Sequence, residues 1–188
     1  MIRPWEKVES EVQGEYEVFR VRRDRCRSPL TGAEHPFYVI EAEDWVNIIP
    51  VTPEGQIVCV EQYRHGTGEV SLEIPGGIID PEDATPAAAG RREMVEETGY
   101  DTDVIVPLGT VAPNPAILNN RCYTFLARDV RRVAEQSLDA TEHVAVRLVD
   151  PAAVPGLIAE GRISHALVVA ALYLYAQHPS QTDARGAD

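Results

Sequence analysis

The stretch from residue 70 to residue 100 constrains the fold of this chain more than any other part of the sequence. A short apolar strand signal, Val70 to Ile74, runs into the pair Gly76-Gly77, and a helix signal follows over residues 86–98. This helix is bounded by an N-cap, a first-turn proline and a terminal glycine, which are Thr85, Pro86 and Gly99. The sequence therefore predicts a strand, a tight turn, an acidic loop and a capped helix in succession.

Three glutamates gather near the C-terminal end of the predicted helix. Glu93 and Glu97 are i,i+4 neighbours and Glu96 lies between them, so all three side chains project toward one side. The helix dipole places partial negative charge at the same end, which makes each carboxylate slightly unfavourable there. One interpretation is a solvated acidic face. The other is a site for a hard divalent cation such as Mg²⁺, which prefers oxygen ligands and relieves the repulsion.

The flanking residues favour the second interpretation, because the whole segment resembles the Nudix box. That pattern is Gly, five residues, Glu, seven residues, then Arg-Glu-apolar-x-Glu-Glu-x-Gly-apolar. The residues that match it by type are Gly77, Arg92, Glu93, Met94, Glu96, Glu97, Gly99 and Tyr100. The resemblance implies a set of metal ligands, comprising Glu93, Glu96, Glu97 (also catalytic) and the carbonyl of Gly76. It implies structural roles in the box for Gly77, Asp83, Arg92 and Gly99.

The segment departs from the pattern in its loop. Asp83 occupies the place of the loop glutamate, and one extra residue separates it from Arg92. In the family this acid mainly orients the arginine and supports the loop. The sequence leaves open whether the shorter acid still pairs with Arg92, whereas the helix carboxylates are unaffected.

A general base is expected from a later loop, because ADP-ribose-hydrolysing members of the family carry an acid just ahead of a late strand. Glu142 has that place, immediately before the strand predicted at residues 143–149. It would deprotonate the attacking water, with Asp139 as the reserve candidate. The alternative for Glu142 is a loop carboxylate beside an edge strand. His143 is a further candidate for the base, although a lone histidine at a strand start is more often structural.

Three further residues resemble substrate-handling positions of the ADP-ribose and nucleotide-sugar pyrophosphatases, and a tryptophan is a candidate by its chemistry alone. Arg64 ends a strand, and its planar fork suits two oxygens of a diphosphate, while Glu73 enters the box and would line the pocket. Pro115 stands fifteen residues after Tyr100, as in the ADP-ribose subgroup. Trp45 is a candidate for stacking on a base. The competing interpretations are a surface charge for the arginine, an ordinary loop proline and a packed aromatic ring.

Composition limits the partners and the compartment. The formal net charge of −13 argues against a general nucleic-acid binder, whose affinity would rest on lysine and arginine. No apolar stretch reaches membrane-spanning length, and the charged N-terminus lacks the apolar core of a signal peptide. Cys26, Cys59 and Cys122 are widely spaced and form no Cys-x-x-Cys pair, so free thiols in a reduced, cytoplasmic compartment are expected.

Interleaved strands and helices predict an α/β fold with a mixed sheet covered on both faces, which the resemblance sharpens to the Nudix α/β/α sandwich. The strands are predicted at residues 8–12, 16–21, 37–42, 45–51, 56–63, 70–74, 104–112, 121–127 and 143–149. The strand over 56–63 is nearly continuous in apolar residues, as a central strand would be. After the box helix, a short helical segment is expected to end at Gly161, and a final helix to run from Ser164 as its N-cap to about Gln177.

The chain divides into three predicted parts: an N-terminal antiparallel β extension over residues 1–45, a Nudix domain over 46–178 and a polar, disordered tail over 179–188. The extension is expected to begin with a hairpin that turns at Gln13-Gly14. The arginines of its second strand are Arg20, Arg22, Arg23, Arg25 and Arg27. They indicate either a solvated edge strand or a phosphate contact across a dimer interface. The resemblance implies a homodimer formed through this extension.

The resemblance implies a Mg²⁺-dependent hydrolase, with Mn²⁺ as a substitute, that cleaves the diphosphate linkage of ADP-ribose or a nucleoside diphosphate sugar. Its products would be a nucleoside monophosphate and a sugar phosphate. One alternative is a sanitising pyrophosphohydrolase for damaged nucleoside triphosphates, or an enzyme acting on RNA ends. Another is a non-catalytic Nudix module that senses a nucleotide. The sequence does not identify the base, the sugar or the number of metal ions.

Overall fold

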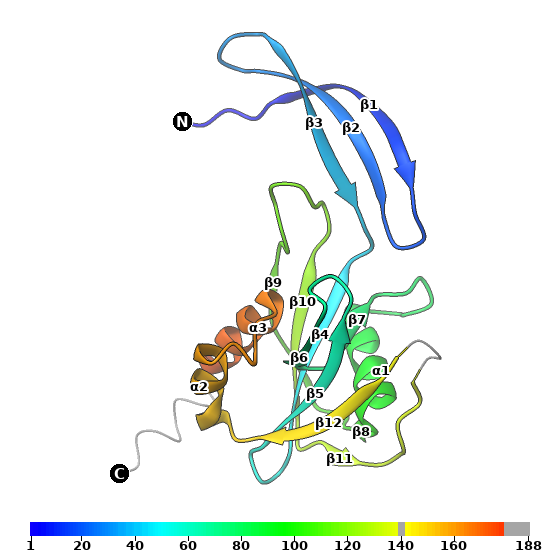
Figure 1. The fold of residues 1–188 in the computed structure, drawn as a ribbon, viewed down its shortest axis with the longest axis vertical. Coiled ribbons are helices and arrows are strands. Elements are labelled where there is room, and N and C mark those ends of the chain that lie inside the picture. The colour runs from blue at the N-terminus through cyan, green and yellow to red at the C-terminus, as the bar shows by residue number, and fades with distance from the viewer. Residues whose placement is uncertain (139–141, 179–188) are drawn as a thin grey trace. The chain divides into compact units, whose positions relative to one another are not determined.

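The computed structural model describes residues 1–138 and 142–178, and Figure 1 gives its ribbon. It consists of two compact units. The first comprises Met1–Asp44 with Ala112–Arg121, and the second comprises Trp45–Val111 with Cys122–Asp188. The reserve base Asp139 and the tail over residues 179–188 lie outside the described residues.

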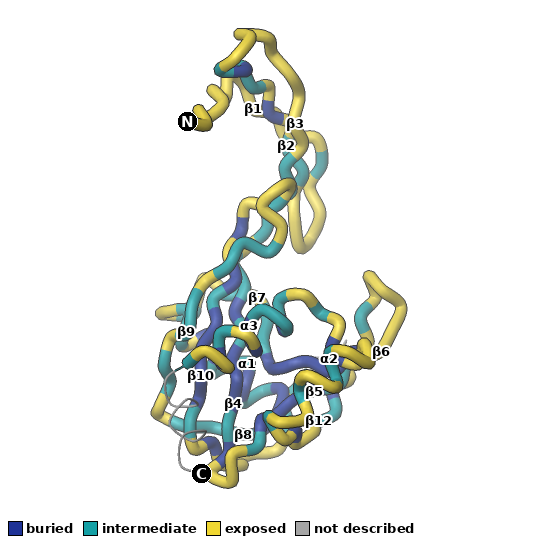
Figure 2. The backbone as a smooth tube through the Cα atoms, turned by 90° about the vertical axis from the view of Figure 1, so that its left-hand side faces the viewer, coloured by how far each residue is buried: buried dark blue, intermediate teal, exposed yellow. Residues whose placement is uncertain are grey.

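The first unit is built on a three-stranded antiparallel sheet in the order β1-β2-β3, much of which is exposed (Figure 2). Its strands are β1 (Glu6–Glu15), β2 (Arg20–Arg27) and β3 (Glu34–Glu41). The prediction of an arginine-rich edge strand was wrong, because β3 pairs along the far side of β2 and makes it the middle strand. Acids on the neighbouring strands pair with several of these arginines, and Arg25 for example pairs with Glu9 of β1 and with Glu34 of β3.

The hairpin between β1 and β2 does not turn at Gln13-Gly14, which corrects the sequence-based prediction. Gly14 continues β1 after a register shift that begins at Val12. The turn is closed further on, where the N–H of Tyr16 donates to the carbonyl of Phe19 at 2.9 Å. A glycine within a strand pattern often marks such a bulge. Here its missing Cβ leaves room for the Tyr16 ring, whose nearest atoms would lie only 3.2 Å from a Cβ.

The second unit contains a seven-stranded sheet along the path β12-β5-β4-β10-β9, with β6 added on β5 and β7 added on β4. Its strands are β4 (Trp45–Val51), β5 (Ile57–Arg64), β6 (Glu69–Glu73), β7 (Gly76–Ile78), β9 (Ile105–Val111), β10 (Cys122–Arg128) and β12 (Val144–Val149). The sheet is mixed, as predicted, since β10 runs parallel to β4 and antiparallel to β9. A separate ladder joins β8 (Tyr100–Asp101) to β11 (Arg131–Arg132).

Helices cover both faces of this sheet (Figure 1). They are α1 (Pro86–Thr98), α2 (Val154–Ala159) and α3 (Ala166–Ala176), with a 3₁₀ turn at Pro151–Ala153. On one face Met94 of α1 packs with Ile48 and Val58, and on the other Leu172 of α3 packs with Ile49. Strand side chains alternate between faces, so the neighbours Ile48 and Ile49 serve two different cores. Burial of each of these aliphatic side chains stabilises the fold by about 1.5–3 kcal/mol. With helices packed on both faces of the sheet, the architecture is the predicted α/β/α sandwich.

The sequence-based predictions for the inner strand β5 and for the last helix α3 differ in outcome. Ile57 and Val58, on opposite faces of β5, are both 0% exposed, which confirms the predicted central strand. The last helix begins later than predicted, because its N-cap is His165 and not Ser164. The imidazole Nδ1 of His165 accepts from the N–H of Leu167 at 3.2 Å, as a serine hydroxyl would. Over the described ranges, no helix is long and apolar enough to cross a membrane.

An ion pair between Arg91 and Asp101 ties α1 to β8. The guanidinium donates through Nε at 2.7 Å and through Nη2 at 2.9 Å, and these hydrogen bonds lower the pKa of Asp101. A carboxylate whose pKa is lower in the folded chain stabilises the fold above its unfolded pKa, and that contribution is lost as the pH falls through the folded pKa.

We expect Asp101→Asn to lower the free energy of unfolding by no more than about 1 kcal/mol near neutral pH, because both side chains of this pair are partly exposed. The difference from the wild type should shrink as the pH falls through the lowered folded-state pKa of Asp101, because the wild type then loses an ion pair that the variant lacks at every pH. Urea unfolding at several pH values measures it. A loss of unfolding free energy that does not change with pH would show that the ion pair between Arg91 and Asp101 is not its cause.

Candidate active site

The acidic helix α1 is held at both ends by the predicted caps. The hydroxyl of Thr85 accepts from the N–H of Ala88 at 3.1 Å, and Pro86 opens the helix. At the other end Gly99 adopts φ +72°, and its N–H donates to the carbonyl of Val95 at 2.8 Å. These caps fix where the last two turns lie, and with them the three glutamates.

The two glycines before the loop let the backbone approach the helix carboxylates closely. A Cβ on Gly77 would lie 2.3 Å from Oε1 of Glu93, and a Cβ on Gly76 would lie 2.3 Å from the carbonyl oxygen of Val46. Neither space admits a side chain. The N–H of Gly76 donates to Oε2 of Glu97 at 3.2 Å, so the turn contacts both carboxylates.

Arg92 organises the loop, and Asp83 does pair with it. Oδ1 and Oδ2 of Asp83 accept from Nε at 3.2 Å and from Nη2 at 2.9 Å, which lowers the pKa of Asp83. A tight turn absorbs the extra loop residue, since the N–H of Asp83 donates to the carbonyl of Asp80 at 3.0 Å. Nη1 of Arg92 also donates to Glu93 at 3.0 Å and to Glu96 at 3.1 Å. One guanidinium therefore connects the acidic loop to two of the three helix glutamates.

Glu93 and Glu97 have the most perturbed electrostatics of the site. Glu97 is only 3% exposed, and burial, reinforced by repulsion from Glu93, raises its pKa to about 8. Burial raises the pKa of Glu93 to about 7, although the positive charge of Arg92 opposes the shift. The charge of Glu142 adds to the repulsion on both groups. The structure thus brings Glu142 into electrostatic range of the helix carboxylates.

Arg64 and Glu73 form a bidentate ion pair on the same side of the sheet. Nε donates to Oε1 of Glu73 at 2.9 Å and Nη2 donates to Oε2 at 2.6 Å. Glu73 is 2% exposed, whereas 40% of the Arg64 side chain is accessible. The sequence predicts that the guanidinium of Arg64 binds two oxygens of a diphosphate. In the structure Glu73 occupies the fork, so a phosphate would meet the N–H groups that remain, chiefly those of Nη1.

A pocket of about 400 Å³ brings Arg64 and Glu142 together. Its lining residues come from the ends of β5 and β12 and from the loops beyond, and they are Gln62, Tyr63, Arg64, His65, Glu142 and His143. The register pairs Gln62 with Val144, which places the start of β12 beside the end of β5. The pocket combines polar side chains with the ring of Tyr63, which contacts the ring of His65 edge to face.

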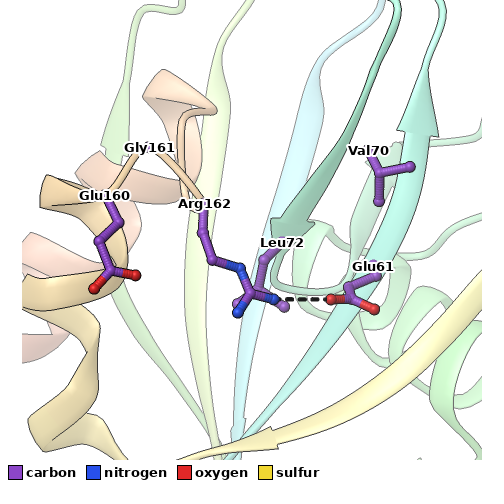
Figure 3. A pocket seen from close by; sticks show the side chains of 6 residues that line it. All are labelled: Glu61, Val70, Leu72, Glu160, Gly161 and Arg162. Carbon is purple, nitrogen blue, oxygen red and sulfur yellow. Dashed lines mark hydrogen bonds and ion pairs between the residues drawn. The ribbon is translucent and has the colours of Figure 1, made fainter.

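The opposite face of the sheet carries a second hollow of about 320 Å³, drawn in Figure 3. Glu61 lies there because it alternates with Gln62 along β5. Its carboxylate accepts from Arg162, as the dashed line shows, at 3.2 Å, and it pairs with Arg147 at 2.8 Å. None of the residues that the sequence predicts as catalytic, metal-binding or substrate-binding lines this hollow. The candidate catalytic groups therefore gather on the α1 face.

The remaining predicted site residues differ in how they relate to this cluster. Glu96 is connected to Glu93 through Arg92, which donates to both carboxylates. Trp45 is the first residue of β4 and pairs with Ile78 beside the box loop. Pro115 belongs to the first unit, where it lies in the segment 112–121, and its role stays a sequence-based prediction.

Among residues 1–138 and 142–178, no three His, Cys, Asp or Glu side chains stand in a ready-made metal-holding group. Arg92 accounts for much of this, because it holds both Glu93 and Glu96. The donor set nevertheless suits a hard cation. Glu93 is partly buried and Glu97 fully buried, their carboxylates repel each other, and a divalent cation would compensate that charge.

Sequence reasoning missed Gln136. Its side-chain Nε2 donates to the backbone carbonyl of Glu97 at 2.6 Å and to that of Val144 at 3.1 Å. The residue lies in a polar loop with no motif around it, and nothing local in the sequence marks it as different from its neighbours.

Comparison with known proteins relates this geometry to a family. The family described as NUDIX domain matches residues 43–172. An ADP-ribose pyrophosphatase of Mycobacterium tuberculosis is 31% identical over 132 residues, which cover 69% of this chain and 62% of that protein. An ADP-ribose pyrophosphatase of Bacillus subtilis is 30% identical over 102 residues, which cover 54% of this chain and 55% of that protein. The chain therefore spans less than two thirds of the length of either relative.

A solved structure extends the comparison to the fold. The crystal structure of an ADP compounds hydrolase aligns with a TM-score of 0.84, covering 100% of this chain and 99% of that chain. The two sequences are 19% identical, so this likeness bears on the fold alone. It supports the α/β/α sandwich described above.

Proposed function

This chain belongs to the NUDIX domain family, and on that premise we propose that it is a metal-dependent pyrophosphohydrolase acting on a small nucleotide. The observation that carries the proposal is the placement of Glu93 and Glu97 against the Gly76-Gly77 turn, with Glu142 close enough to add to the repulsion on both carboxylates. A diphosphate is hard to hydrolyse because its negative oxygens repel an incoming hydroxide. Carboxylates would worsen that repulsion on their own, so their concentration here makes sense with a cation among them.

The proposed cation is Mg²⁺, with Mn²⁺ as a substitute. Glu93 and Glu97 would hold it, supported by Glu96 and by the backbone carbonyl of Gly76, with water completing the shell. When bound, the cation supplies charge neutralisation at the phosphate oxygens and a more acidic water. Glu96 joins this set only by leaving Arg92, with which it is paired.

The remaining steps rest on side chains of the chain itself. Glu142 would accept the proton of the attacking water, for which its place beside the helix carboxylates is suitable. Arg64 would donate hydrogen bonds to a phosphate oxygen through Nη1. Glu73 would keep the guanidinium of Arg64 in place, since it already holds Nε and Nη2. Asp83 and Arg92 would keep the loop against the helix.

The proposed substrate is ADP-ribose or a nucleoside diphosphate sugar, giving a nucleoside monophosphate and a sugar phosphate. The names of the relatives support this class: two are ADP-ribose pyrophosphatases, and a mouse ADP-sugar pyrophosphatase is 34% identical over 83 residues, which cover 42% of this chain and 38% of that protein. The polar pocket around Arg64 is consistent with a sugar phosphate. Trp45 and Pro115 remain proposed substrate contacts.

Three broader properties complete the proposal. The extension over residues 1–45 would form a homodimer, for which its exposed antiparallel sheet is suitable. The compartment would be cytoplasmic, in keeping with free cysteines. Nucleic acid is not an expected partner, given the net charge of −13.

The deciding experiment is phosphatase-coupled release of phosphate from ADP-ribose, GDP-mannose, UDP-glucose, ADP-glucose and dGTP. Each is run with Mg²⁺, with Mn²⁺ and with chelator. We expect metal-dependent turnover of at least one diphosphate sugar, and loss of that turnover in chelator.

Two other results would replace the proposal. Turnover of dGTP alone would assign the chain to the sanitising pyrophosphohydrolases. Absence of turnover on every compound, together with calorimetric binding of ADP-ribose, would identify a non-catalytic sensor.

A further inference from the structure

The side chain of Gln136 joins the acidic helix to the strand that follows Glu142. Its amide nitrogen donates one hydrogen bond to the carbonyl of Glu97 at 2.6 Å and another to the carbonyl of Val144 at 3.1 Å. Gln136 is half-buried, whereas residues 131–135 before it are exposed. A residue that turns inward from an exposed loop and uses both amide hydrogens on backbone oxygens acts as a cross-link.

The contact completes the C-terminal end of α1. The last four carbonyls of a helix have no partner within it. Here the carbonyl of Val95 accepts from the N–H of Gly99 at 2.8 Å, and that of Glu96 accepts from the N–H of Ser137 at 2.9 Å. The amide of Gln136 supplies the donor for the next carbonyl, that of Glu97. The segment around Gln136 is therefore docked on the same residues whose side chains form the acidic cluster.

The other end of the cross-link fixes the start of β12. Within residues 1–138 and 142–178 this strand ends the sheet path, so in that part of the chain no neighbouring strand pairs with the carbonyls along its outer side. Gln136 supplies a donor to the carbonyl of Val144. Val144 lies two residues after Glu142, and its side chain is buried at 6% exposure. Holding the backbone of Val144 therefore limits where the carboxylate of Glu142 can lie.

We propose that Gln136 is a positioning residue that sets the separation between the carboxylate of Glu142 and that of Glu97. This rests on the proposed function, in which Glu142 accepts the proton and Glu97 holds the cation. The amide acts through the backbone of both residues and touches neither the substrate nor the metal. Such preorganisation matters because a misplacement of about 1 Å in a catalytic group can cost about a hundredfold in rate.

The first test compares Gln136→Met, which keeps the length and removes both donors, with Glu135→Gln as the matched control. Glu135 is adjacent, and its exposed carboxylate pairs with exposed Arg132 in the i,i+3 position. We expect Gln136→Met to lower kcat by about ten- to a hundredfold, with KM for the diphosphate sugar changed by less than about twofold. The control should match the wild type. A change in KM alone, or no change in kcat, would overturn the proposal.

A double-mutant cycle separates positioning from general destabilisation. If Gln136 acts by placing Glu142, then Gln136→Met should cost little activity in a Glu142→Gln background. Effects that multiply would mean that Gln136 acts independently of Glu142, which contradicts the proposal. Rates are measured well below the melting temperature of each variant, so that loss of folded protein does not enter.

An activity-independent readout keeps this inference distinct from the proposed function. Hydrogen–deuterium exchange of the β12 amides should be faster in Gln136→Met than in the wild type and unchanged in Glu135→Gln. Unchanged exchange in both variants would overturn the cross-link itself. A wild type that turns over nothing, with the exchange difference present, would instead refute the proposed function and leave the cross-link standing.

Discussion

Glu97→Gln is expected to lower kcat by about a thousandfold at saturating Mg²⁺. The amide keeps the shape of the side chain and an oxygen that can still accept from Gly76, but it removes the charge that would hold the cation. Losing several kcal/mol of metal-derived transition-state stabilisation corresponds to about three powers of ten in rate. The loss is measured by steady-state kinetics on whichever of the five compounds named above the wild type hydrolyses.

The same substitution should leave the metal-free fold intact or make it more stable. A buried carboxylate repelled by Glu93 and Glu142 is unfavourable without a cation, and the neutral amide relieves that repulsion. Glu96→Gln is the control, because its side chain is 41% exposed and paired with Arg92, and we expect at most about a tenfold loss there. Equal losses in the two variants, or full activity in Glu97→Gln, would refute the assignment of Glu97.

Gly99→Ala is expected to cost about 2–5 kcal/mol in the free energy of unfolding. The backbone at Gly99 has φ +72°, where a side chain is strained by about 1–2 kcal/mol. An added Cβ would also lie 2.1 Å from the carbonyl oxygen of Ala134, and relieving such a clash costs about 1–3 kcal/mol more. The loop cannot retreat easily, because the N–H groups of Val133 and Ala134 both donate to the carbonyl of Gly99.

Gly55→Ala separates the two contributions. Gly55 has φ +82° and no atom within 4 Å of the added Cβ, so only the backbone strain applies there. Guanidinium unfolding of both variants should place Gly99→Ala at least about 1 kcal/mol below Gly55→Ala. If the two variants lose the same stability, the loop is not packed against the helix end as described.

The features that could be predicted from the sequence are those with local signals. Thr85, Pro86 and Gly99 mark the ends of α1 because caps depend on one backbone conformation each. Ile57 to Val60 read as a buried central strand because their apolar run is continuous. The spacing of Glu93 and Glu97 predicted that they lie on one side of α1, in agreement with the repulsion between them, while their role as metal ligands stays a prediction from the resemblance.

The features that could not be predicted depend on pairing between distant segments. Gly14 reads as a turn until the partner strand shows that it follows a bulge. Glu73 fills the fork of Arg64 because the β5–β6 register sets them on the same face, and strand order is not a local property. Gln136 contacts a carbonyl 39 residues away, and no nearby residue signals that contact.

The ion pair between Arg64 and Glu73 has a consequence for anyone who wishes to redesign the substrate range. Position 64 faces the pocket and is an obvious choice for a mutant library, yet its partner is a carboxylate with almost no access to water. Replacing Arg64 alone leaves the buried carboxylate of Glu73 without its ion-pair partner. Variants from such a library would therefore mostly be poorly folded. Positions 64 and 73 should therefore be randomised together, with pairs of neutral residues included. Variants that fold but differ in substrate selectivity can then be distinguished from variants that do not fold.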